Sequence, residues 1–314
     1  MLSNDREHYS SLMTSASESC DLSVVVGSTE AAGTLRDCLA ALRTTCAGLD
    51  TEILVVDASS VDDAAHICAE FSEVRLTRLP PGTLVPLLWG AGLRAARGRV
   101  VAFTIGQCVV DQGWARAMLD GIASGAAGVG GRLDLRKGSS ATVRATFYLR
   151  YSAWLAARQG PAHEIAGDNA AYDHESLRAA QDRLAAGFWE VDVHARFREL
   201  GKRLVLHPAA TARFGGDFKL RDMAALRFAH GRHSGAFRVA QGIRTRWQMV
   251  LGAPLVPGIL LARVARRVAA VPAHWPGFLS AIGAFLVLAT AWAAGEAMGG
   301  LSAPQKMRDA LRAA

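Results

Sequence analysis

The chain has few of the residues that crosslink small secreted domains or hold structural metals. Its 314 residues include five cysteines, with no Cys-x-x-Cys pair and no histidine spacing that suits zinc. We therefore expect reduced thiols in a cytosolic domain. Charged residues make up only 20% of the chain and hydrophobic residues 51%, which excludes a disordered or low-complexity protein.

The first 30 residues contain neither a recognisable secretory signal peptide nor the glycine motif of dinucleotide-binding proteins. Residues 1–20 are polar and lack the apolar run of a secretory signal peptide, so we expect a flexible leader there. The first β-branched run is followed by Gly27-Ser28-Thr29-Glu30 and not by Gly-x-Gly-x-x-Gly. An ordinary dinucleotide-dependent enzyme is therefore disfavoured.

The positive charge is concentrated in one window. The whole chain carries a net +7, but residues 200–274 hold 13 Lys and Arg against two acids, or +11, so the other 239 residues sum to −4. This window lacks the stacking aromatics of a nucleic-acid groove and lies beside an apolar tail, which favours an anionic membrane surface over nucleic acid. A merely solvated basic face is the alternative.

The N-terminal two thirds alternate between short β-branched runs and amphipathic stretches. This alternation is typical of parallel βαβ units and predicts an α/β domain. Expected strands are 23–26, 52–56, 74–78 and 99–103, with helices at 31–43, 62–71 and 87–96 between them. We also expect a helix over 191–200 and a strand over 203–207 that Pro208 ends.

The C-terminal part is apolar enough to enter a membrane. Residues 277–295 contain no charge, and 19 residues suffice for a helix that crosses the roughly 30 Å hydrocarbon layer. Residues 247–262 are also apolar but contain Pro254 and Pro257, so we expect a re-entrant or interfacial helix, or a kinked span. We expect a membrane anchor, with the number of spans open.

Several ordered segments resemble family-2 glycosyltransferases, which have the GT-A fold. Residues 52–62 match the family's strand and Asp-Asp-Gly-Ser-Thr-Asp turn, and 92–103 match its helix-to-strand link. Residues 166–172 resemble its acceptor-side Gly-Asn-x-Ala-Tyr element, and 189–192 resemble its Glu-Asp-x-Asp helix. The resemblance extends over about nine tenths of the chain and rests on the order of these segments.

This resemblance implies roles for nine residues. An inverting transfer needs a general base that takes the acceptor's proton, and Glu190 stands at that position with Asp192 as a second carboxylate. Asp57 occupies the place of the carboxylate that binds a uracil-type base. The other implied donor-binding residues are Ser28, Glu30 and Gln107, and the implied acceptor-side residues are Asp168, Asn169 and Trp189.

The sequence departs from the family where a divalent cation is usually held. The Asp-x-Asp position reads Ile105-Gly106-Gln107, so we expect no metal ligands there, although a divalent cation such as Mg²⁺ or Mn²⁺ is the family's usual cofactor. Three explanations stay open: donor binding without metal, a donor with a different leaving group, or a noncatalytic member kept for binding or assembly at the membrane.

The sequence thus predicts a membrane-associated glycosyltransferase with a cytoplasmic catalytic domain at the cell membrane. Its expected partners are a nucleotide-sugar donor, a lipid-linked or glycan acceptor and membrane lipids, with no nucleic acid. The expected organisation is a leader (1–20), a GT-A-like domain (21–215), a basic neck (216–246), membrane-associated helices (247–300) and a tail (301–314). A catalytically degenerate binding or assembly subunit is the alternative.

Overall fold

The computed structural model describes residues 20–29, 32–156, 158–185, 187–240 and 242–302. Its contacts divide the chain into two compact units. The first comprises residues 1–131 and 159–211, and the second comprises 132–158 and 212–314. The expected leader lies outside the described residues up to position 19, and the functional division into five parts stays a prediction.

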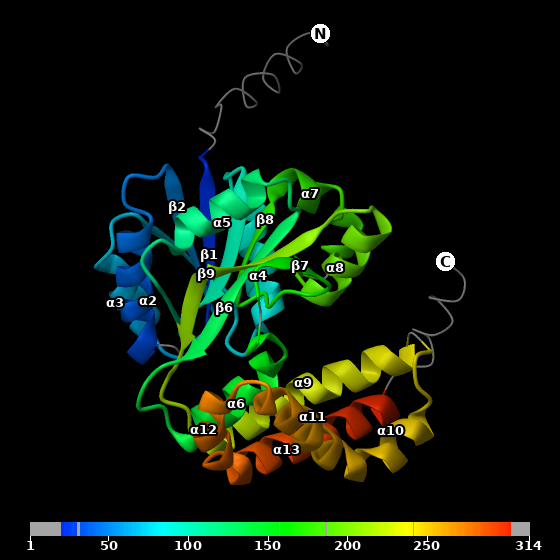
Figure 1. Ribbon diagram of the computed structural model, residues 1–314. Coiled ribbons are helices and arrows are strands. Elements are labelled where there is room, and N and C mark those ends of the chain that lie inside the picture. Colours follow the sequence, from blue (N-terminus) through cyan, green and yellow to red (C-terminus); the bar gives the residue numbers. More distant parts are fainter. Residues whose placement is uncertain (1–19, 30–31, 157, 186, 241, 303–314) are drawn as a thin grey trace, which may run out of the picture. The chain divides into compact units, whose positions relative to one another are not determined.

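The described residues form a nine-stranded mixed sheet, and most of its strands lie in the first unit (Figure 1). Its path is β3-β2-β1-β4-β8-β6-β9-β5, with β7 on β9. The first four strands of this path are parallel, and β8 turns antiparallel to β4. The strands are β1 Leu22–Ser28, β2 Thr51–Asp57, β3 Val74–Arg78, β4 Val100–Ile105, β5 Cys108–Val110, β6 Gly128–Leu135, β7 Gly160–Ala162, β8 Asn169–Asp173 and β9 Leu204–Phe214.

Helices flank this sheet, which confirms the α/β class. In the first unit they are α2 Ala32–Thr45, α3 Asp63–Ala69, α4 Val85–Ala95, α5 Trp114–Ala123, α7 His174–Arg178 and α8 Glu190–Glu199. Every residue of β1 and β4 is buried, because helices cover both faces of these central strands. Their continuous β-branched runs are the reason that the sequence pattern identified them.

The end of the last long strand was predicted wrongly. β9 does not stop at Pro208 but continues to Phe214. A proline only removes one N–H donor from a strand, and a strand continues where that donor is not needed by a neighbour. After Pro208, the carbonyl of Thr211 accepts a hydrogen bond from the amide of Asp111 at 2.9 Å, so β9 still has a bonded neighbour beyond the proline.

The second unit is helical apart from the ends of β6 and β9. Its helices are α6 Ala141–Tyr151, α9 Leu220–Ala240, α10 Arg246–Gly252, α11 Val256–Ala269, α12 Trp275–Leu279 and α13 Ile282–Ser302. Two stretches are long and apolar enough to cross a membrane, Arg246–Ala269 and Ile282–Ser302. Pro254 and Pro257 lie in the first turns of successive helical segments, where a missing N–H does not matter. The apolar run from 277 divides at Ser280, which ends α12.

Helix α4 packs on β1 so closely that Gly92 leaves no room for a side chain. A Cβ at Gly92 would lie 2.2 Å from Cγ1 of Val25. We therefore expect Gly92→Ala to lower the free energy of unfolding by about 1–3 kcal/mol. The control is Gly33→Ala on α2, where a Cβ meets open space and stability should change little. Urea denaturation followed by circular dichroism measures both, and equal effects would contradict this account of the packing.

Candidate active site

Two of the residues expected to bind the donor, Ser28 and Asp57, meet at the carboxyl edge of the parallel strands. Ser28 ends β1 beside Asp57 at the end of β2, and Gly27 pairs in register with Ile105 at the end of β4. Ligands of open α/β sheets bind at this edge. The hydroxyls of Ser28 and Thr104 at this edge are buried and have no hydrogen-bond partner within the described ranges, which is uncommon for buried polar groups.

The Asp57 carboxylate is fully buried and holds the turn that follows it. It accepts hydrogen bonds from the hydroxyl of Ser59 at 2.6 Å and from its amide at 3.2 Å. Nε of Arg78 lies 3.7 Å from Asp57, and the same guanidinium pairs with Asp62. The sequence analysis missed Arg78, although its place as the last residue of β3, in register with Asp57, was a signal that could have found it.

The side chains at the usual metal position do not fit a divalent cation. Ile105 is apolar and buried, and Nε2 of Gln107 donates to the carbonyl of Thr29 at 2.9 Å. In the part of the chain that the structure describes, no three His, Cys, Asp or Glu side chains gather as a metal would require. Glu30, the remaining expected donor residue, lies outside the described residues.

Glu190 is the first residue of α8. Trp89 of α4 lies between Glu190 and this edge of the sheet. A Cβ built on Gly167 would lie 2.9 Å from the Trp89 ring and 3.5 Å from Cδ of Glu190, so the carboxyl carbon and the indole share the space over this glycine. The indole N–H of Trp89 donates to the carbonyl of Thr104 at 2.9 Å. Trp89 thus links the end of β4 to the candidate base, a role that the sequence analysis did not assign to it.

Asp192 lies near Glu190 in sequence but on a different side of α8, because residues two apart on a helix do not face each other. Burial raises the pKa of Asp192, and the positive charge of Arg183 opposes this shift. Both carboxylates stand in the first turn of the helix, where the helix dipole stabilises negative charge.

The three expected acceptor-side residues differ in their surroundings. Asn169 is fully buried, and its amide accepts from the indole of Trp114 at 2.6 Å and donates to the carbonyl of Ala210 at 2.9 Å. These bonds give Asn169 a place in the scaffold between β8, β9 and α5. Asp168 is buried beside it, and Trp189 is half-buried at the N-cap of α8, directly before Glu190.

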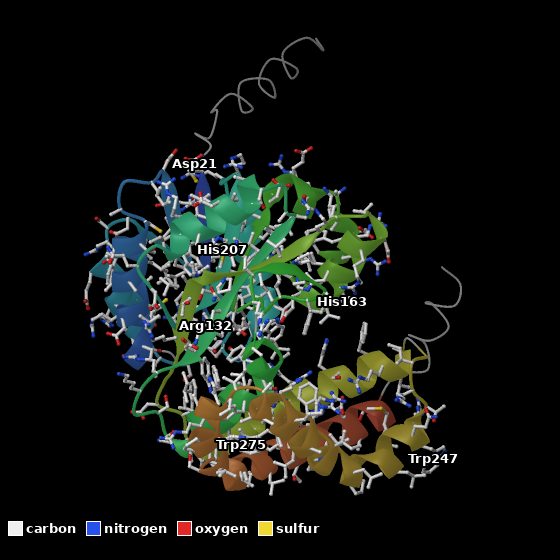
Figure 2. The ribbon with its side chains drawn as sticks, in the orientation of Figure 1. Asp21, Arg132, His163, His207, Trp247 and Trp275 are labelled. Carbon is white, nitrogen blue, oxygen red and sulfur yellow. The ribbon has the colours of Figure 1, made fainter. Side chains whose placement is uncertain are left out.

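A polar chain that is fully buried at His194 and Tyr172 joins α8 to its neighbours and was not predicted. His194 is fully buried, its Nε2 lies 2.8 Å from the Tyr172 hydroxyl, and its Nδ1 is hydrogen-bonded to Glu164. Arg198 also donates to Glu164, at 2.8 Å; Figure 2 labels the adjacent His163. Burial raises the pKa of Tyr172 well above its usual range, and the charges of Glu190 and Glu164 add to this shift. The chain therefore fixes α8, and with it Glu190, against β8.

Comparison with models of protein families gives a match. The family model described as Glycosyl transferase family 2 matches residues 23–180, half of the chain. This range includes Ser28, Asp57, Gln107, Asp168 and Asn169, whereas α8 lies beyond it. No curated protein matches the sequence.

Removing the imidazole of His194 should destabilise the first unit. His194→Phe leaves the buried Tyr172 hydroxyl without this partner and takes one hydrogen bond from Glu164, so we expect a loss of about 2–4 kcal/mol in the free energy of unfolding. The control is His163→Phe, whose side chain is 76% exposed and whose replacement should matter little. Denaturant unfolding of both variants measures the difference, and equal stabilities would show that the chain does not hold α8.

Proposed function

The chain belongs to glycosyltransferase family 2, whose members transfer glycosyl groups, and on this basis we propose that it moves a sugar from a nucleotide-sugar donor to a membrane-associated or glycan acceptor, with inversion. The observation that carries the proposal is the position of Glu190. Its carboxyl group lies over Gly167 beside Trp89, which is itself hydrogen-bonded to the end of β4. A base and a donor-binding edge within reach of each other are what a direct displacement requires.

In the proposed reaction the Glu190 carboxylate takes the proton of the acceptor hydroxyl. The freed oxygen attacks the anomeric carbon of the donor sugar and forms the new C–O bond. The bond from that carbon to the nucleotide diphosphate breaks, and its electron pair leaves with the phosphate oxygen. Attack from the face opposite the leaving group inverts the anomeric configuration.

We propose that the donor lies along the carboxyl edge of β1, β2 and β4. The unpartnered hydroxyl of Ser28 supports this placement, as does the rigid Asp57–Ser59 turn that Arg78 braces. Since neither Ile105 nor Gln107 supplies a metal carboxylate, we propose that arginines or main-chain N–H groups meet the charge of the diphosphate in place of a cation.

The acceptor is proposed to be a lipid-linked sugar or another membrane-bound glycan. Two apolar helical stretches and the +11 window over residues 200–274 support this choice, because they bring the second unit to an anionic membrane. The catalytic domain then works at the cytoplasmic face of the cell membrane, and Asp168 and Trp189 line the acceptor side next to Glu190.

One observation favours a second candidate function. The apolar Ile105 and the occupied amide of Gln107 are also what a family member without catalysis would carry. Such a protein would bind a glycan or a partner at the membrane as an assembly subunit. Absence of transfer together with absence of nucleotide binding would favour this second function.

The role of Glu190 is testable by charge removal. Radiolabelled nucleotide sugars are incubated with the detergent-solubilised protein and a membrane lipid extract, and label is followed into the lipid fraction. Glu190→Gln should reduce transfer by about 10²–10⁴-fold, because the amide cannot accept the proton, while nucleotide affinity stays unchanged. The control is Glu199→Gln, at the far end of the same helix, which should keep full turnover. Transfer by Glu190→Gln at the parent rate would remove Glu190 from the mechanism.

A further inference from the structure

The second unit presents an apolar stripe that nothing in its described residues covers. Trp247, Leu251, Leu255 and Ile259 recur every four residues and are 71, 73, 65 and 52% exposed, so they share one face of the Arg246–Ala269 stretch. Trp247 points outward at the tip of this stretch (Figure 2). Only 11% of the apolar window in this stretch is buried, unlike the core helix of a water-soluble domain.

Helix α13 continues the apolar surface but is covered on another side. Leu286, Val287, Met298 and Leu301 are exposed along it. Its small residues pack against α9: a Cβ at Gly295 would lie 2.2 Å from the carbonyl oxygen of Phe228, and one at Gly299 would lie 1.9 Å from that of Arg232. Both partners advance by four residues, so the two helices run parallel with their backbones in contact.

Glycines on both helices and a buried carboxylate hold α9 and α13 together. On α9, a Cβ at Gly231 would lie 2.3 Å from the carbonyl oxygen of Trp292, and one at Gly235 would lie 2.0 Å from that of Glu296. The Glu296 carboxylate is buried within the apolar helix, accepts a hydrogen bond from Ser234 at 3.0 Å and forms an ion pair with Arg238 at 3.2 Å, both on α9. If α13 separated from α9, the Glu296 carboxylate would lose both of these partners within an apolar helix. Helix α13 therefore stays packed against α9.

Helix α9 cannot accompany α13 into hydrocarbon. Arg232 and His233 are exposed away from its ends, and Arg221, Asp222 and Arg238 are exposed near its ends. Moving such a helix to the middle of a bilayer is costly, and snorkelling serves only side chains near the ends of a helix.

Arginines bound the apolar stripe at both ends. Arg244 and Arg246 precede it, and Arg263 and Arg266 follow it. Arginines at both ends suit a helix that lies along an anionic surface, with its apolar face in the acyl chains and its cations among the phosphates.

We propose that the second unit is monotopic: the face carrying Trp247, Leu251, Leu255 and Ile259 enters one leaflet of an anionic bilayer, α9 stays at the water side of α13, and neither apolar stretch crosses the membrane. This inference rests on the proposed membrane association and deepens it. It places the described residues on one side of the bilayer.

The first test is accessibility to a membrane-impermeant maleimide in right-side-out and inverted vesicles from cells that make the full chain. Single cysteines are introduced by Ala273→Cys, between the two apolar stretches, and by Ser302→Cys. Arg116→Cys on α5 serves as the reference for the side that carries the catalytic domain. All three positions are exposed. The five native cysteines are buried and free, and the parent chain reports their background. We expect all three sites to react in the same vesicle type. Reaction of position 273 or 302 from the opposite side, or only after detergent, would overturn the proposal.

The second test measures binding to vesicles of phosphatidylcholine with and without phosphatidylglycerol. The double variant Leu251→Gln/Leu255→Gln should bind the anionic vesicles at least about tenfold more weakly, because both side chains lose their apolar contact with lipid. The matched control is Val61→Gln, an exposed apolar side chain in the first unit, 49% exposed, which should not change binding. A parent chain that ignores both vesicle types would contradict membrane association itself, whereas binding combined with far-side labelling would contradict only the monotopic arrangement. Transfer and nucleotide binding are measured separately and report on the proposed reaction.

Discussion

The indole of Trp89 is the contact on which the candidate active site depends. Its N–H is bonded to Thr104 at the end of β4, and its ring lies against the backbone of Gly27 and of Gly167. The contact at Gly167 leaves no room for a side chain, since a Cβ there would lie 2.9 Å from the indole, and a Cβ at Gly27 would be a tight contact at 3.3 Å. Through this one side chain, the edge that suits a donor and the carboxylate that suits a base are held in one place.

Much of the first unit could be predicted because its chemistry is local. Continuous β-branched runs identify β1, β2 and β4, since strands buried on both faces need no polar alternation. The position of Asp57 followed from the same rule, because a polar residue directly after a buried strand lies at the carboxyl edge. Glu190 was found by its resemblance to a helix start in the family and not by any pattern of its own.

The rest depends on contacts between distant segments, which a single sequence does not display. Trp89 reads as one more apolar residue of a helix, and His194 reads as a polar residue of α8, although it is fully buried between Tyr172 and Glu164. The extension of β9 beyond Pro208 depends on where a neighbouring strand needs a donor. Tertiary structure decided each of these features, and local propensity did not.

The chain belongs to the family, and its expected metal position carries Ile105 and Gln107, while Glu190 remains the proposed base. The central claim is that this edge still binds a nucleotide and does so without a cation. Calorimetric titration of the solubilised chain with UDP, GDP, dTDP and CMP, each with Mn²⁺ and again with EDTA, tests it most directly. The account predicts that one nucleotide binds with the same Kd under both conditions. Loss of that binding in EDTA, or no binding of any of the four, would contradict it.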